Sequence, residues 1–230
     1  MTIPSDALIA SLCQAVYRPG ALIDPTWDHF DLGADDGVCW ALKKLDGFDV
    51  VVFRGSITVQ DWMRDLFVLP LPGIIPLLTK IGHVHAGFWM GMENVWSEVR
   101  PLLTQPVIVT GHSLGAARAS ILTGLMVNDG TIPIARVVFG EPKPGLIDLG
   151  ELIKGVPARS YRNGDRLHHD VVTDVPMTLP PHQFVHPTPI VPVCAEPTGD
   201  LFSRLGAFAY HHIELYVAAV TALTPKETAI

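Results

Sequence analysis

Apolar residues along this chain follow two different periods. The segments 106–110 and 134–140 are short, continuous and rich in β-branched residues, as buried strands are. In the segment 87–103 the apolar positions instead recur every three or four residues, which is typical of an amphipathic helix. The residues that carry this helical spacing are Phe88, Met92, Val95, Trp96 and Val99.

The remaining segments continue the alternation of strands and helices. The dipeptide Asp46-Gly47 joins two short apolar runs, 38–45 and 48–55, and predicts a β-hairpin. Strands that alternate with helices of ten or more residues predict an α/β fold, with a mostly parallel central sheet and helices on both faces. The other predicted elements are a first helix capped by Ser5 or Asp6, helices at 114–127 and 146–154, a strand at 158–162 and a last helix around 212–222.

The segment from Val175 to Pro197 is rich in proline, which predicts an ordered loop with room for one edge strand. No internal repeat, low-complexity tract or linker divides the chain. A length of 230 residues also suits one domain with a full core. We therefore expect a single domain over residues 1–230.

Composition excludes several classes of protein. The net charge is −7 and no run of Lys or Arg is present, so a nucleic-acid partner is not expected. Three cysteines without a Cys-x-x-Cys spacing predict neither a disulfide framework nor a zinc site. The first twenty residues lack the basic start and cleavage site of a signal peptide, which predicts a cytoplasmic protein, with a secreted form as the alternative. The sequence indicates no oligomeric state.

A Gly-x-Ser-x-Gly pattern at residues 111–115 follows a strand-like run and precedes helix-forming residues. This is the context in which a serine sits on a sharp strand-to-helix turn and presents its hydroxyl at the edge of a sheet. Ser113 is therefore the candidate nucleophile. The backbone N–H of Leu114 would open the following helix, where unpaired donors suit an oxyanion hole. The alternative is that Ser113 only caps a helix in a glycine turn.

Several segments resemble, in the same order, the class 3 lipases, which have the α/β-hydrolase fold. The similar segments are VVVFRGS, HAGF, GHSLGAA and FGEPKPG, and the resemblance covers about residues 38–220. It implies hydrolysis of carboxylic esters by a Ser-His-Asp triad without a cofactor. It also implies that Ser56 supplies the second oxyanion donor beside Leu114.

The family resemblance also suggests the catalytic acid and base. The segment DVVTDVP matches the family pattern around the acid and points to Asp170, while Asp165 is the alternative and Asp174 a third candidate. In this fold the base follows the acid in the chain. The similarity of the segment YHHIELY to the family's terminal segment favours His211, with His212 as the alternative over the loop residues His182 and His186.

The apolar region at about 57–82 corresponds to the lid region of the family, with Trp62 where lipases carry a tryptophan. A mobile apolar cover would bind acyl chains and contact lipid interfaces transiently. Alternatively, residues 74–78 pack on the sheet as a short core helix. We therefore expect a triacylglycerol lipase or esterase acting on a small-molecule or lipid ester.

Two other functions are compatible with the sequence. One is an esterase for polar esters such as feruloyl or cutin-like groups, and another is a non-catalytic binding protein that kept the fold. His83 and His85 form a His-x-His pair, a spacing that metal sites use. Because no acidic or cysteine partner lies nearby in the sequence, no metal site is predicted.

Overall fold

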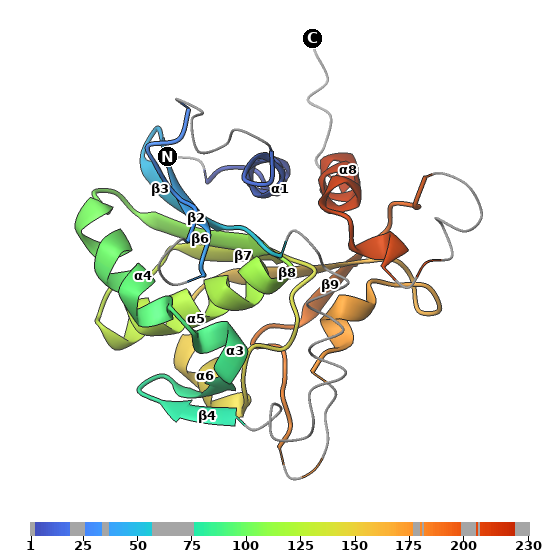
Figure 1. Ribbon diagram of the computed structural model, residues 1–230. Coiled ribbons are helices and arrows are strands. Elements are labelled where there is room, and N and C mark those ends of the chain that lie inside the picture. Colours follow the sequence, from blue (N-terminus) through green and yellow to red (C-terminus); the bar gives the residue numbers. More distant parts are fainter. Residues whose placement is uncertain are drawn as a thin grey trace.

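The computed structural model describes residues 3–18, 26–33, 37–56, 76–176, 180, 182–198, 206 and 208–223. A seven-stranded sheet lies at its centre (Figure 1). In spatial order its strands are β1 (His29–Asp31), β2 (Trp40–Leu45), β3 (Phe48–Phe53), β6 (Val107–His112), β7 (Ala135–Phe139), β8 (Ala158–Asn163) and β9 (Ile190–Val193).

The sheet is mostly parallel, as the alternation of elements predicts. Strands β3, β6, β7, β8 and β9 run parallel to one another, whereas β1 and β2 are antiparallel additions at one edge. The predicted hairpin between β2 and β3 is confirmed, with Leu45 opposite Phe48 across the Asp46-Gly47 turn. The edge strand expected within residues 175–197 is β9.

Helices cover both faces of the sheet (Figure 1). The helices α1 (Asp6–Ala15) and α8 (Ile213–Leu223) lie side by side on one face. The other face carries α3 (Ala86–Trp89), α4 (Met92–Val99), α5 (Leu114–Asn128) and α6 (Ile147–Ile153). No helix in the described part of the chain is long and apolar enough to cross a membrane.

Two hydrophobic cores result from the alternation of side chains along the central strands. On β3, Val50 and Val52 belong to the core beneath α1 and α8, while Val51 and Phe53 belong to the core beneath α5. Successive side chains of a strand point to opposite faces, so a strand covered on both sides is apolar over most of its length. This explains the continuous apolar run that identifies β3.

The prediction of one continuous helix over 87–103 is wrong. The chain forms α3, breaks, forms α4 and ends in the 3-10 helix η3 (Arg100–Leu102). The break lies at Met90, which is extended at ψ 128°, and Gly91, which is left-handed at φ 80°. Glycine adopts this conformation without the steric penalty of a side chain. The apolar period therefore continues across two separate helices.

Two further elements lie outside the predicted pattern. Strand β1 extends the antiparallel edge, and β4 (Pro76–Thr79) pairs with β5 (Gly82–His85) in a separate two-stranded hairpin. The predicted core helix at 74–78 is wrong for residues 76–78, which form β4. Leu77 and Leu78 on this strand are exposed, Leu78 by 68% of its surface.

Candidate active site

Ser113 occupies the turn between β6 and α5, at the carboxyl end of a central parallel strand. Its φ is 61° and its ψ is −131°, and among the described residues it is the only non-glycine with positive φ. Such a backbone conformation is strained for a residue with a side chain and persists where the surroundings impose it. The N–H of Ser113 donates to the carbonyl of Phe139 on β7, at 3.0 Å, which fixes the turn to the neighbouring strand.

The glycines of the Gly-x-Ser-x-Gly pattern allow close backbone packing. A Cβ atom added at Gly111 would lie 2.3 Å from the carbonyl oxygen of Gly115. A Cβ at Gly115 would lie 2.4 Å from the carbonyl oxygen of Phe53, at the end of β3. Both distances are far inside van der Waals contact, so neither position accepts a side chain without rearrangement. The two glycines let α5 begin directly against β6 and β3.

Asp170 and His211 form a buried hydrogen-bonded pair. Nδ1 of His211 lies 2.7 Å from Oδ2 of Asp170, and the side chains are 2% and 0% exposed. The hydroxyl of Tyr216 on α8 donates to the same carboxylate oxygen, and the N–H of Val172 donates to Oδ1 at 2.9 Å. Asp170 lies directly before the 3-10 helix η4 (Val171–Asp174), whereas His211 ends the 3-10 helix η5 (Ala209–His211).

These contacts keep Asp170 ionised. Burial alone would raise the pKa of its carboxyl group, but the charge and hydrogen bond of His211 oppose this effect. Together with the hydrogen bonds from Tyr216 and Val172, they hold the pKa below its usual value. An ionised carboxylate accepts the proton of Nδ1, which directs the lone pair of neutral His211 to Nε2.

Gly140 leaves the space that the side chains of Asp170 and His211 occupy beside the end of β7. It follows β7 directly and has a φ of 57°. A Cβ there would lie 2.7 Å from Oδ2 of Asp170 and 3.1 Å from Nδ1 of His211. Glycine is therefore required twice, by the backbone conformation and by the two side chains beside it.

His211 packs against His112, the residue that precedes Ser113. The ring of His112 stacks on that of His211, with centroids 4.6 Å apart and an interplanar angle of 30°. The hydroxyl of Ser113 and Nε2 of His211 are both buried, and neither has a hydrogen-bond partner within the described ranges. Buried polar atoms are normally paired, so these two unpaired atoms need a structural or functional explanation.

The end of β3 reaches the same place. A Cβ on Gly55 would lie 2.8 Å from Cβ of Ser113, so Gly55 packs directly against the candidate nucleophile. Ser56, the predicted oxyanion donor, is the next residue and is half-buried. Leu114, the other predicted donor, is the first residue of α5, where N–H groups have no partner within the helix.

The alternative acids lie in other surroundings. The carboxylate of Asp165 is 63% exposed and accepts hydrogen bonds from the N–H groups of Leu167 and His168 within its own turn. These backbone bonds lower its pKa. Asp174 is also exposed and pairs with Nε2 of His169 at 2.8 Å. Neither has a recorded contact with His211 or His212.

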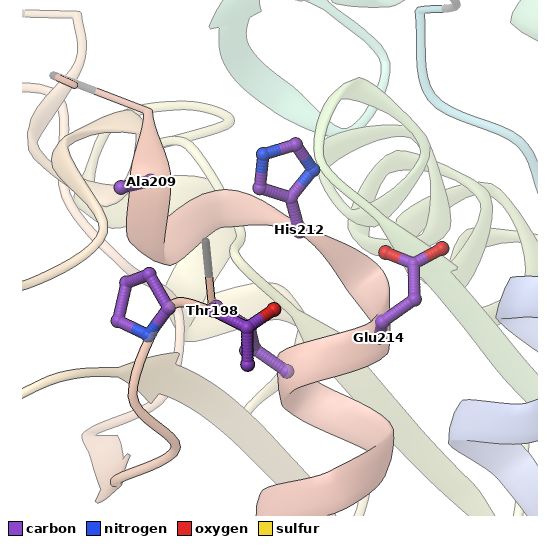
Figure 2. Close-up of a pocket in the computed structure, with 6 residues that line it drawn as sticks. Thr198, Ala209, His212 and Glu214 are labelled. Atoms are coloured by element: carbon purple, nitrogen blue, oxygen red, sulfur yellow. The ribbon is translucent and has the colours of Figure 1, made fainter. Parts of the chain in front are cut away.

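The alternative bases lie in other surroundings than His211. His212 is exposed and lines a pocket of about 280 Å³ beside the start of α8, together with Pro197, Thr198, Ala209, Glu214 and Leu215 (Figure 2). His186 bonds through Nε2 to the carbonyl of Thr173 at 2.8 Å. His182 is half-buried at an isolated position in the loop before β9.

The His-x-His pair on β5 consists of two dissimilar residues. His83 pairs with Asp148 of α6, and its Nδ1 lies 2.6 Å from Oδ2 of Asp148. His83 therefore has an acidic partner, which the sequence does not indicate because the two residues are 65 positions apart. His85 is buried against Phe88 and Phe184, and burial lowers its pKa to about 4. No group of three His, Cys, Asp or Glu side chains suited to a metal ion occurs in the described segments.

The predicted lid region lies mostly outside the described residues. This applies to 57–75, including Trp62, so the lid stays a prediction. Only residues 76–82 are described, and they form β4 and the turn into β5.

Three residues at the site have no assigned part in the sequence prediction: Tyr17, His112 and Tyr216. Tyr216 is part of the segment YHHIELY, so the motif contained a signal for it. His112 lies within the Gly-x-Ser-x-Gly pattern, at a position that the pattern leaves open. Tyr17 carried no signal, because its contacts are with residues more than thirty positions away.

The model of the class 3 lipase family matches residues 50–179, which is more than half of the chain. The chain belongs to the class 3 lipase family. A lipase of Caenorhabditis elegans is 31% identical over 144 residues, which cover 56% of this chain and 40% of that protein. Phospholipase A1-II 1 of rice is 28% identical over 185 residues, covering 68% and 45%. The chain thus spans less than half the length of these curated relatives.

Solved structures of fungal lipases share the fold. The mono- and diacylglycerol lipase of Aspergillus oryzae superimposes with a TM-score of 0.66 and 19% identity, covering 94% of this chain and 97% of that one. The Rhizomucor miehei lipase in its propeptide complex gives a TM-score of 0.61 at 19% identity, covering 75% and 62%. This class 3 lipase therefore has the α/β-hydrolase fold predicted from its sequence.

Proposed function

We propose that this class 3 lipase hydrolyses carboxylic esters through Ser113 as nucleophile, His211 as general base and Asp170 as the acid that orients the base. The observation that carries the proposal is the pair of unpaired buried atoms, Oγ of Ser113 and Nε2 of His211. The opposite nitrogen of the same ring is bonded to Asp170. The base and its orienting carboxylate thus have the relation that acyl transfer requires.

The proposed reaction begins when Nε2 of His211 takes the proton of Ser113 as Oγ attacks the ester carbonyl. Asp170 stabilises the imidazolium that forms, through the hydrogen bond at Nδ1. The negative charge on the carbonyl oxygen is met by the N–H groups of Ser56 and Leu114, and each such donor is worth about 3 kcal/mol of barrier. His211 then returns the proton to the leaving alkoxide, and water hydrolyses the acyl-enzyme.

The proposed substrates are acylglycerols. Support comes from the family and from a relative in Penicillium cyclopium, a secreted mono- and diacylglycerol lipase that is 26% identical over 152 residues, covering 61% of this chain and 48% of that protein. A second candidate is a glycerophospholipid, because the rice relative is a phospholipase A1. Release of fatty acid from diacylglycerol and from phosphatidylcholine, measured in the same emulsion, separates the two.

The central test is Ser113→Ala. We expect the hydrolysis of p-nitrophenyl butyrate to fall on the order of 10⁴-fold, because removal of the nucleophile eliminates the acyl-enzyme route. A fluorophosphonate probe should label the wild type and leave the variant unlabelled. The melting temperature should stay within about 2 °C, since the hydroxyl has no recorded hydrogen bond to lose. An active or labelled variant would contradict the proposal.

The distinction between lipase and soluble-ester esterase needs a second measurement. Activity on p-nitrophenyl esters of increasing chain length is followed below and above the solubility limit of each ester. A lipase is expected to accelerate when the substrate forms an interface, whereas an esterase for polar esters should saturate below that limit. Feruloyl esters serve as the polar comparison.

A further inference from the structure

A chain of hydrogen bonds joins four separate segments beside Ser113. The hydroxyl of Tyr17, two residues beyond the end of α1, accepts from the N–H of Gly55 at 2.9 Å. The same hydroxyl lies 3.0 Å from Nδ1 of His112. Nε2 of His112 lies 2.8 Å from the carbonyl oxygen of His211. The chain therefore runs from the end of β3, through the residue before the nucleophile, to the proposed base.

The direction of each hydrogen bond follows from the chemistry of its ends. The carbonyl oxygen of His211 only accepts, so Nε2 of His112 carries a proton. If His112 is neutral, its Nδ1 is then an acceptor, and the hydroxyl of Tyr17 donates to it. The oxygen of Tyr17 remains free to accept from Gly55, which only donates. Every donor thus faces an acceptor, and no other arrangement of a neutral His112 satisfies both ends.

His112 is held in the neutral form that this arrangement needs. Burial and then the neighbouring charge of His211 lower the pKa of His112 to about 3. Its ring therefore adds no second positive charge when the stacked His211 becomes an imidazolium during the proposed reaction. A neutral ring stacked on the base also limits the orientations that the base can adopt.

The atoms around the hydroxyl of Tyr17 are packed closely enough to fix its position relative to Gly55 and His112. A Cβ at Gly55 would lie 2.3 Å from the oxygen of Tyr17 and 2.7 Å from the carbonyl oxygen of His112. The hydroxyl thus takes a space that only glycine at this position leaves open. A change at Tyr17 is therefore expected to shift Gly55. It would shift Ser56 as well, because Ser56, the proposed oxyanion donor, follows Gly55 directly.

We propose that Tyr17 and His112 are positioning residues that hold the oxyanion strand and the catalytic histidine at a fixed spacing around Ser113. The inference rests on the proposed ester hydrolysis and assigns new roles within it. Neither side chain transfers a proton to substrate. Tyr17 acts through Gly55 and His112, and His112 acts through the backbone of His211.

The first test compares Tyr17→Phe with Tyr161→Phe. Each variant loses one hydroxyl that makes a partly buried hydrogen bond, but that of Tyr161 donates to Asp6 between α1 and β8 rather than to any site residue. We expect Tyr17→Phe to lower kcat for p-nitrophenyl butyrate roughly 10- to 100-fold with KM within about twofold, because misplaced oxyanion donors act on the transition state. Tyr161→Phe should keep kcat within about twofold even where its melting temperature falls equally.

The second test removes the two hydrogen bonds of His112 separately or together. His112→Asn keeps an acceptor near the place of Nδ1, and His112→Gln keeps a donor near the place of Nε2, whereas His112→Ala keeps neither. Both amide variants should retain a higher kcat than His112→Ala. The rate of inactivation by a fluorophosphonate should rank the three variants in the same order as kcat.

The outcomes separate this inference from the proposed function. A wild type that neither hydrolyses esters nor takes the fluorophosphonate label overturns both. An active wild type whose Tyr17→Phe variant matches Tyr161→Phe in kcat overturns the positioning roles alone. Should Tyr17→Phe fail to fold, equal kcat for His112→Asn, His112→Gln and His112→Ala overturns them instead.

Discussion

Two buried charged clusters lie close together in the fold and differ in how completely they are paired. In the first, the ion-pair cluster, Glu141 bonds to Arg136, Ser120 and Ser160. Arg136 also bonds to Thr188 at 2.6 Å, which leaves only its Nε without a recorded partner. In the second, the catalytic cluster, Asp170 is fully bonded, but the far nitrogen of His211 and the hydroxyl of Ser113 are unpaired.

The difference shows how a fold separates stability from reactivity. Both clusters arise at the carboxylate-bearing loops after β7 and β8, and both hold a carboxylate that is 0% exposed. Where a carboxylate bonds to a guanidinium and two hydroxyl groups, as Glu141 does, the network stabilises a unique core. Where the chain of partners ends in unpaired atoms, the same burial leaves the proposed base and the proposed nucleophile available for a substrate.

The largest effect is expected at His211, the open end of the catalytic cluster. His211→Ala should lower kcat on the order of 10⁴-fold or more, because no other base replaces Nε2. His212→Ala is the matched control, since His212 is adjacent in sequence but exposed in the pocket of Figure 2. Its kcat should stay within about threefold of the wild type. A greater loss at His212 than at His211 would reverse the assignment of the base.

The next effect is expected at Asp170. Asp170→Asn should lower kcat roughly 10³- to 10⁴-fold, because an amide neither stabilises the imidazolium nor keeps the proton on Nδ1. Asp165→Asn changes the same atoms in an exposed turn and should leave kcat within about threefold. Steady-state kinetics of the two purified variants decide between them. Comparable losses of kcat in the two variants would contradict the assignment of Asp170 as the acid that orients the base.

The ion-pair cluster should respond in stability rather than in rate. Glu141→Gln leaves Arg136 buried without its counter-charge, which costs about 3–5 kcal/mol in the free energy of unfolding. The melting temperature should fall by roughly 6–20 °C for a chain of this size. Glu151→Gln, which breaks only the exposed pair with Lys154, should change stability by less than about 0.5 kcal/mol. Below the melting transition, Glu141→Gln should keep kcat within about threefold.

The same variant has a pH signature. Burial raises the pKa of Glu141, but the charge of Arg136 and the nearby His186 and Ser120 together bring it below the usual value. A lowered folded pKa means that the charged form adds stability above the unfolded value of about 4.3 and loses it as the pH falls further. The difference in urea midpoint between wild type and Glu141→Gln should therefore shrink below pH 4.3. A constant difference would show that the charge is unimportant.

Sequence reasoning identified the elements whose evidence is local. Continuous apolar runs marked β3, β6 and β7, and the Gly-x-Ser-x-Gly pattern marked the turn at Ser113, since both signals lie within a few residues. The break at Gly91 was missed because the apolar period continues across it. Strand β1 was missed because three half-buried residues give no clear pattern.

Residues brought together over long distances could not be predicted in the same way. His83 and Asp148 are 65 positions apart, and Tyr17 and His112 are 95 apart. The sequence between these residues does not indicate that their side chains meet, because the crossover helices determine which segments become neighbours. Asp165 and Asp170 were both plausible acids for the same reason: only the folded chain buries one and exposes the other.

The pairing of α1 with α8 has a consequence for the order in which the site can form. Tyr17 follows the first helix, whereas His211 and Tyr216 belong to the last described turns of the chain, and the two helices pack against each other on one face of the sheet (Figure 1). During synthesis the ribosome releases the nucleophile long before the histidine that would activate it. A nascent chain that ends before His211 therefore lacks the proposed base for Ser113, so the onset of esterase activity would report that the last described turns have folded.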